Sequence, residues 1–192
     1  MTDTRSDPPA TLLIVPGLRD HVAQHWQTLL AQQRPDAVSL APLGRDNLAL
    51  APRIDALEAA VAAAPGTVVL VAHSGGCVLV AHWAARSTRV HRVRGALLAT
   101  PPSFDRPLPA GYPTLEGLDA AGWLPVPRAP LPFRTLVAAS RNDALGEFSA
   151  VTALAQDWGS ALEDLGAVGH LNPASGYGPW PMALPLIGRL LR

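Results

Sequence analysis

Ser74 lies in the stretch LVAHSGGCVLVA (residues 70–81), where an apolar run gives way to small residues and then resumes. A serine hydroxyl is a weak nucleophile at neutral pH. A catalytic serine therefore needs a histidine to accept its proton and usually a carboxylate to orient that histidine. It also needs a tight turn that holds the hydroxyl clear of the preceding strand. Two interpretations of Ser74 follow: a nucleophile between a strand and a helix, or a small polar residue in an ordinary turn.

The residues around Ser74 approximate the G-x-S-x-G motif of a nucleophile elbow. The two outer positions of that motif are glycine because the end of the strand and the start of the helix crowd there. Gly76 fills the second position, but Ala72 stands at the first, so the turn must accommodate one extra methyl group. Gly75 gives the backbone further freedom. Ser-Gly-Gly also suits an ordinary turn, so the motif alone leaves both interpretations open.

Two later residues supply the partners that a nucleophilic serine needs, in the chain order serine, acid, histidine that accompanies this motif. Asp143 lies in RNDALGEF after a predicted strand at 134–140, and His170 lies in AVGHLNPASG after a predicted strand at 161–166. Taken singly, Asp143 also suits a turn and His170 a surface loop. Their order and positions favour a Ser74, Asp143, His170 triad. The other histidines all precede Asp143: His21, His25, His73, His82 and His91.

Acyl transfer at a serine also needs two backbone N–H groups directed at the developing oxyanion. We expect one from Gly75, which directly follows the nucleophile. The other is expected from Leu18, because Gly17 permits a turn after the first predicted strand. Pro16 and Gly17 alone would indicate only a turn. Their position after the first predicted strand makes this turn a candidate for the loop that supplies the second oxyanion donor.

The elements that must position these residues alternate between strand and helix, which is typical of a parallel sheet covered by helices on both faces. We therefore predict a three-layer α/β/α fold, with a mostly parallel open sheet, in a single domain spanning 1–192. The carboxyl ends of such strands form the ligand-binding edge, and Ser74, Asp143 and His170 all follow predicted strands. Strands are predicted at 11–17, 37–41, 67–73, 95–100, 134–140 and 161–166. Helices are predicted at 22–34, 51–65, 76–86, 147–159 and 180–192, the last interrupted at Pro185.

Residues 101–132 break this alternation, since they hold nine of the chain's 20 prolines. Proline at this density argues against a regular element, whereas the aromatic residues argue against a solvated linker. We predict an ordered excursion over one edge of the domain. Phe104, Tyr112 and Trp123 are its candidates for lining an acyl pocket, and packing of these rings onto the sheet is an equally good interpretation.

Composition narrows the classes of partner. Lysine plus arginine and aspartate plus glutamate both number 15, so no global charge attracts nucleic acid or an anionic membrane. Cys77 is the only cysteine, which excludes an internal disulfide and is typical of a reducing compartment. No apolar run approaches the roughly 20 residues that span a bilayer, and the first ten residues lack the pattern of a secretion signal. We expect a soluble cytoplasmic protein with a small or uncharged substrate.

Several segments together resemble the small, lidless α/β-hydrolases grouped with retinoblastoma-binding protein 9 and the YdeN-like bacterial serine hydrolases. They are LLIVPGL, QHW at 24–26, VVLVAHSGG at 67–76, SRND at 140–143 and GHLNPASGYGPWP at 169–181. The resemblance extends over nearly the whole chain. It implies an open parallel sheet, the Ser74, Asp143 and His170 triad, no metal or organic cofactor, and esterase-like activity. Ala72 and the ALGEF sequence after Asp143 depart from many relatives.

The predicted function is hydrolysis of small carboxylic esters through an acyl-enzyme at Ser74. The lack of a large cap predicts an open site for short acyl groups. One alternative is a protein-interaction module with weak esterase activity, and a protein partner or homodimer stays open. Another is an acyltransferase or peptidase with the same triad. A nucleotide-binding domain is disfavoured, because no G-x-G-x-x-G or Walker-type loop follows the first strand.

Overall fold

A six-stranded parallel sheet forms the centre of the protein in the computed structural model, which describes residues 10–19 and 22–192. The strands lie in the order β2-β1-β3-β4-β5-β6, and every neighbouring pair is parallel. Their bounds are β1 Thr11–Val15, β2 Ala37–Ser39, β3 Val68–His73, β4 Val93–Ala99, β5 Arg134–Ala139 and β6 Ala161–Asp164. The predicted parallel sheet is confirmed.

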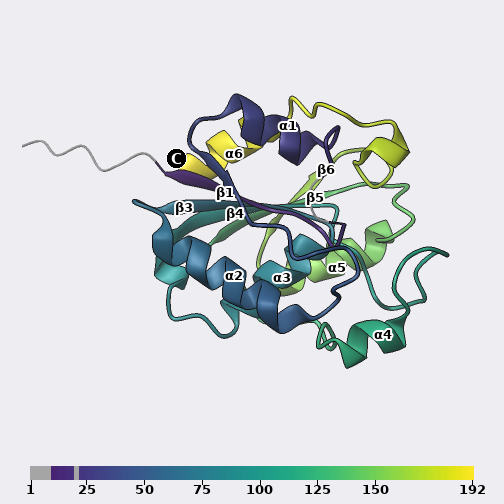
Figure 1. The fold of residues 1–192 in the computed structure, drawn as a ribbon. Helices are drawn as coiled ribbons and strands as arrows, with labels where there is room; N and C mark the ends of the chain where they lie inside the picture. The colour runs from purple at the N-terminus through teal and green to yellow at the C-terminus, as the bar shows by residue number, and fades with distance from the viewer. Residues whose placement is uncertain (1–9, 20–21) are drawn as a thin grey trace, which may run out of the picture.

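Helices cover both faces of the sheet, as Figure 1 shows: α1 and α6 lie on one side, and α2, α3 and α5 on the other. The three-layer α/β/α prediction is therefore also confirmed. The helices are α1 Trp26–Gln33, α2 Leu50–Ala63, α3 Gly75–Ala84, α4 Leu115–Ala120, α5 Phe148–Asp157 and α6 Ala183–Leu191. Within the described ranges, none of them has the length and apolar character needed to cross a membrane.

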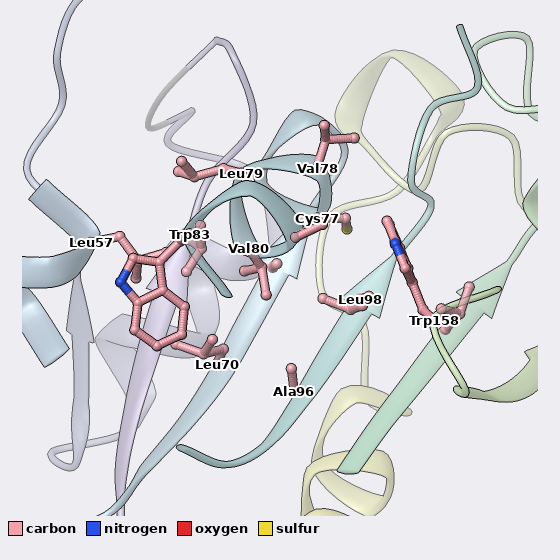
Figure 2. Close-up of a cluster of buried hydrophobic side chains, with 14 of the residues drawn as sticks. Leu57, Leu70, Cys77, Val78, Leu79, Val80, Trp83, Ala96, Leu98 and Trp158 are labelled. Atoms are coloured by element: carbon pink, nitrogen blue, oxygen red, sulfur yellow. The ribbon is translucent and has the colours of Figure 1, made fainter. Parts of the chain in front are cut away.

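The apolar core is divided in two by the sheet, because successive strand side chains point to opposite faces. In β3, Leu70 and Ala72 join the cluster under α2, α3 and α5, whereas Val69 and Val71 join the cluster under α1 and α6. Figure 2 shows the first cluster, with side chains of α3 lying over those of β3 and β4. All residues of β3 are buried, as expected for a central strand covered on both faces. The turn that carries Ser74 thus follows a strand that is enclosed on both faces.

The proline-rich segment at 101–132 is ordered, and it contains one short regular element, the helix α4. Thr114 caps this helix by accepting a hydrogen bond from the Gly117 N–H at 3.0 Å. Trp123 fastens the segment to its neighbours: its indole N–H donates to the Leu48 carbonyl at 2.7 Å, and its carbonyl accepts from His82 Nε2 at 3.0 Å. The segment therefore packs on the α2 and α3 side and reaches the carboxyl end of the sheet.

The last helix differs from the prediction. It begins at Ala183, so Pro185 lies in its first turn and does not interrupt it. Backbone N–H groups of a first turn have no acceptor within the helix, and a proline there removes no helical hydrogen bond. The sequence interpretation was wrong because it started the helix too early. α1 likewise starts at Trp26, later than the predicted residue 22.

Candidate active site

Ser74 occupies a sharp turn between the end of β3 and the start of α3. Its backbone has φ 55° and ψ −129°, a conformation that non-glycine residues rarely adopt. A Cβ atom added to Gly76 would lie 2.4 Å from the Val15 carbonyl oxygen, so a side chain cannot fit there. Ala72 is fully buried, and its methyl group belongs to the core cluster beneath α3. The elbow therefore requires glycine at its second outer position and tolerates alanine at its first.

The structure brings the three predicted catalytic residues together in a continuous hydrogen-bonded chain. Ser74 Oγ lies 2.8 Å from His170 Nε2, and His170 Nδ1 lies 2.8 Å from Asp143 Oδ2. A carboxylate only accepts, so Nδ1 carries the proton, and Nε2 is free to accept the serine hydroxyl proton. The Asp143 side chain is 2% exposed, and its other oxygen accepts the Leu145 N–H at 2.9 Å. This is the geometry that a serine nucleophile, its base and an orienting acid require.

The backbone of His170 is held by side chains rather than by regular secondary structure. Its N–H donates to Ser175 Oγ at 2.9 Å, and its carbonyl accepts from His73 Nε2 at 2.9 Å. The preceding Gly169 N–H donates to Asn142 Oδ1 at 2.6 Å. Polar contacts from three segments thus determine where the imidazole lies.

Backbone strain gathers at the same place. Among the described residues, three non-glycine residues have positive φ: Ser74, Thr100 and Leu171. Thr100 directly follows β4, beside the Ser74 turn, and its hydroxyl lies 3.5 Å from the His170 carbonyl oxygen. Leu171 follows His170 and is fully buried. Strained residues of this kind persist where the surrounding contacts enforce them, and they cluster at functional sites.

Three histidine rings lie next to one another behind the serine. The ring centroids of His25 and His73 are 4.5 Å apart, and those of His73 and His170 are 4.9 Å apart. Burial, followed by the electrostatic effect of the neighbouring His170 ring, lowers the pKa of His25 from 6.5 to about 4. Burial also brings the pKa of His73 well below its usual value, with further contributions from His170 and His25. Both rings are therefore neutral at pH 7.

The two predicted oxyanion donors lie on adjacent backbone segments beside Ser74. A Cβ atom added to Gly75 would lie 3.1 Å from Leu18 Cγ and 3.7 Å from the Leu18 backbone nitrogen. Gly75 is the first residue of α3, so its N–H has no acceptor within the helix. The loop carrying Leu18 also closes on the nucleophile, since a Cβ on Gly17 would lie 3.1 Å from Ser74 Cβ. This arrangement suits two donors that converge on one oxygen.

A cavity of about 550 Å³ opens beside Ser74 and His170. Its volume is within the range of pockets that enclose small organic ligands. Phe104, Tyr112 and Trp123, the three predicted pocket residues, all line it. Trp123 is also 1% exposed and hydrogen-bonded to Leu48, so it supports the wall as well as facing the cavity. Both interpretations of the aromatic residues therefore apply to Trp123.

Sequence reasoning missed residues that hold the strands next to the site in place. Gln27 Nε2 donates to the carbonyl oxygens of Val15 and Val71, at 3.1 and 2.8 Å, and so joins β1 to β3 just before the elbow. The available signal was a glutamine next to the inward-facing apolar residues Trp26 and Leu30 of α1. Trp26 of the QHW segment packs against Trp180 of the GPWP segment, with ring centroids 4.8 Å apart. Two segments that carry the family resemblance are thus in direct contact.

Cys77 lies in the first turn of α3, beneath the elbow. It is fully buried, its Sγ lies 3.4 Å from the Ala99 carbonyl oxygen, and burial raises the pKa of its thiol. A reactive cysteine needs an accessible thiolate, so this side chain acts as a small apolar group. Elsewhere in the described parts of the chain, no group of three or more histidine, cysteine, aspartate or glutamate side chains is placed to hold a metal ion.

Comparison with known protein families agrees with this geometry. A family model described as serine hydrolase matches residues 12–189. The chain belongs to the serine hydrolase family. It is also similar to a YdeN-like hydrolase from Pectobacterium atrosepticum, with 26% identity, a TM-score of 0.80, and coverage of 95% of this chain and 90% of that one. The predicted relationship to YdeN-like serine hydrolases is confirmed, and this protein is a serine hydrolase.

More distant structures share the fold of this serine hydrolase. The ydeN gene product of B. subtilis is 19% identical, with a TM-score of 0.68 and coverage of 95% of this chain and 98% of that one. An esterase from Thermogutta terrifontis is 16% identical, with a TM-score of 0.64 and coverage of 95% and 89%. At these identities the likeness concerns the fold. A search of curated proteins found no match to the sequence.

Proposed function

We propose that this serine hydrolase cleaves small carboxylic esters through an acyl-enzyme intermediate on Ser74. The observation that carries the proposal is the hydrogen-bonded chain from Ser74 Oγ through His170 to Asp143, with both links at 2.8 Å. The chain ends in a cavity whose volume suits a small molecule. A peptide substrate would instead favour an extended groove.

In the first half of the reaction, Ser74 Oγ attacks the acyl carbon while His170 Nε2 accepts the hydroxyl proton. The carbonyl oxygen becomes an oxyanion, which the N–H groups of Leu18 and Gly75 stabilise. Asp143 stabilises the resulting imidazolium through Nδ1 and keeps the ring in the required tautomer. The bond from the acyl carbon to the alcohol oxygen then breaks, and His170 transfers its proton to the departing alkoxide.

The second half returns the enzyme to its starting state. Water attacks the acyl carbon of the Ser74 ester, and His170 Nε2 accepts a proton from that water. The oxyanion forms again between Leu18 and Gly75. Its collapse releases the carboxylic acid, and the proton returns from His170 to Ser74 Oγ. No group beyond the chain's own residues is needed for these steps.

Steady-state hydrolysis of p-nitrophenyl butyrate tests this proposal. Ser74→Ala is expected to lower kcat by roughly 10⁴-fold or more, and Asp143→Asn by a comparable amount, because each removes a member of one unit. Ser149→Ala, an exposed serine on α5, serves as the matched control and keeps wild-type turnover. A Ser74→Ala variant that stays within about twofold of wild type would contradict the assignment.

The same assay separates the alternative activities. Wild-type turnover equal to spontaneous hydrolysis would overturn esterase function and favour the protein-interaction module. Capture of the acyl group by added alcohols or amines in preference to water would favour an acyltransferase, and cleavage of the matching p-nitroanilide would favour a peptidase. We expect hydrolysis to dominate in each comparison.

We also propose that the protein acts in the cytoplasm. The support is the single cysteine, which is buried beneath the elbow and forms no internal disulfide. Cell fractionation with an antibody against the native protein tests the location, and recovery outside the cytoplasmic fraction would contradict it.

A further inference from the structure

Two arginines line the cavity that contains Ser74. They are Arg19, in the loop after β1, and Arg45, in the loop before α2. No aspartate or glutamate is among the lining residues that the structure describes. Formal positive and negative charges balance over the whole chain, so two cations here do not reflect a generally basic protein. The cavity is therefore locally positive in a chain that is neutral overall.

Arg19 is oriented by an aromatic ring that lines the same cavity. Its guanidinium carbon lies over the Tyr112 ring, 4.6 Å from the centroid. Such stacking uses the flat face of the guanidinium and leaves its N–H groups, which lie in the plane, able to bind a carboxylate. Arg19 also directly follows Leu18, one of the two residues assigned to the oxyanion. The backbone that carries Arg19 thus adjoins the oxyanion position, while its guanidinium lies over the Tyr112 ring.

Arg45 lies on a loop that the surrounding structure fixes in place. Buried Arg53 donates from Nη2 to the carbonyl oxygens of Gly44 and Asn47, at 3.4 and 2.8 Å, on either side of Arg45. Trp123 then holds the next carbonyl, that of Leu48, at 2.7 Å. The backbone that presents Arg45 to the cavity is therefore held by two buried side chains.

Neither arginine is neutralised by the ion pairs that the described residues form, which use Arg34, Arg89, Arg106, Arg128, Arg141 and Arg189. The wall of the same cavity also includes the apolar side chains of Phe104 and Leu108. A chain of methylene groups would lie against such a wall, and a terminal anion would meet the arginines.

We propose that the preferred substrates are esters whose acyl chain ends in a carboxylate, that is, half-esters of linear dicarboxylic acids. The inference rests on the proposed esterase function and names the substrate class of that site. The ester carbonyl would lie at Leu18 and Gly75, the methylene chain against Phe104 and Leu108, and the free carboxylate between Arg19 and Arg45. Guanidinium groups bind carboxylates through paired N–H donors, which a neutral chain end cannot use.

The test compares two substrates of the same shape and different charge: the p-nitrophenyl half-ester of adipic acid and p-nitrophenyl 6-methylheptanoate. The measured quantity is the ratio of their kcat/KM values, acid over neutral, at pH 7, where the carboxylate is ionised. We expect wild type to favour the acid by about tenfold, since two partly solvated arginines each contribute modestly. Most of this preference should arise in KM.

Charge variants identify the source of the preference. In the Arg19→Gln, Arg45→Gln double variant the ratio should fall to about one. The Arg19→Lys, Arg45→Lys double variant retains both charges but not the paired N–H donors, so it should keep only part of the preference. Arg94→Gln, which removes an exposed arginine of β4 outside the cavity, is the matched control and should keep the wild-type ratio. Raising ionic strength from about 0.05 to 0.5 M should lower the wild-type ratio, because salt screens exposed charges.

The outcomes separate this inference from the proposed function. A wild-type ratio at or below one, or a ratio that the double Gln variant leaves unchanged, overturns the carboxylate preference while esterase function stands. Failure of the wild type to hydrolyse either ester overturns the proposed function itself. A wild-type preference that is lost in the Gln variant, kept in part in the Lys variant and kept in full in the Arg94 variant supports the inference.

Discussion

The two halves of the site are positioned by different forces. Ser74 lies between the buried strand β3 and the helix α3, and Gly76 allows that helix to approach the Val15 carbonyl. His170 lies in a loop, where its N–H donates to Ser175 Oγ and its carbonyl accepts from His73 Nε2. Packing and backbone sterics therefore fix Ser74, the proposed nucleophile, whereas polar contacts fix His170, the proposed base.

This difference indicates how each half can be damaged. A tightly packed elbow responds to added volume, because the close-packed neighbouring atoms leave no space for an extra methyl group. The histidine side responds to loss of hydrogen-bond donors and to protonation of buried rings. Substitutions in the elbow around Ser74 should therefore change mainly stability. Substitutions around His170 should change mainly pH dependence and turnover.

Gly76→Ala should produce the largest loss of stability. Its new Cβ would lie 2.4 Å from a backbone oxygen, which cannot move without shifting β1. We expect the free energy of unfolding to fall by about 3 kcal/mol, at the upper end of overpacking effects. Urea denaturation measures it. Gly188→Ala is the matched control: nothing lies within 4 Å of its Cβ, and alanine favours the α6 helix, so it should raise stability slightly. Equal stability of both variants would contradict packing control of the elbow.

His25 should make the histidine side sensitive to acid. Its pKa is about 4 in the folded protein and 6.5 when unfolded, so the unfolded state binds more protons between these values. Above pH 6.5 His25 is neutral in both states and does not lower the free energy of unfolding. As pH falls from 6.5 toward 4, the unfolded state gains a proton at His25 and the free energy of unfolding falls. Between pH 7 and pH 5 we expect His25 to account for about 2 kcal/mol of lost stability.

His25→Asn isolates this contribution. Asparagine can still cap α1 by accepting the Gln27 N–H, as His25 Nδ1 does at 3.2 Å, but it does not titrate. Urea denaturation at pH 7 and pH 5 should show a smaller loss for the variant than for wild type. If both proteins lose the same amount, the pH dependence arises elsewhere.

His73 should affect turnover with a smaller change in free energy. His73→Phe removes the donor to the His170 carbonyl and is expected to lower kcat about tenfold, equivalent to about 1.4 kcal/mol, with little change in KM. His73→Gln places an N–H at the same number of bonds from the backbone and should restore most of kcat. A Gln variant no better than Phe would show that the hydrogen bond does not position His170.

Prediction from sequence succeeded for features that follow from local apolar runs and from the order of the strands along the chain. The strands and their parallel arrangement follow from alternating apolar runs, and the order of Ser74, Asp143 and His170 along the chain follows from strand ends that share one edge. The structure brings these three within hydrogen-bond distance. Their catalytic roles stay predictions until the variants are measured.

Other features depend on contacts between residues distant in sequence, which no local pattern reveals. The elbow histidine His73 was set aside because it could not be the base, yet it supports His170, 97 residues away. The positive cavity arises because Arg19 and Arg45 lie on different loops that meet only in the folded chain. Pro185 was misjudged by a boundary error of three residues, since the expected start was residue 180 and α6 begins at Ala183.

The most direct test of the central claim is to locate the nucleophile chemically. A fluorophosphonate probe should label wild-type protein, and the added mass should fall on the tryptic peptide 54–86, in which Ser74 is the only serine. Ser74→Ala should stay unlabelled, and labelling should slow strongly in Asp143→Asn. Absence of labelling in wild type, equal labelling of Ser74→Ala, or added mass on another peptide would contradict the account.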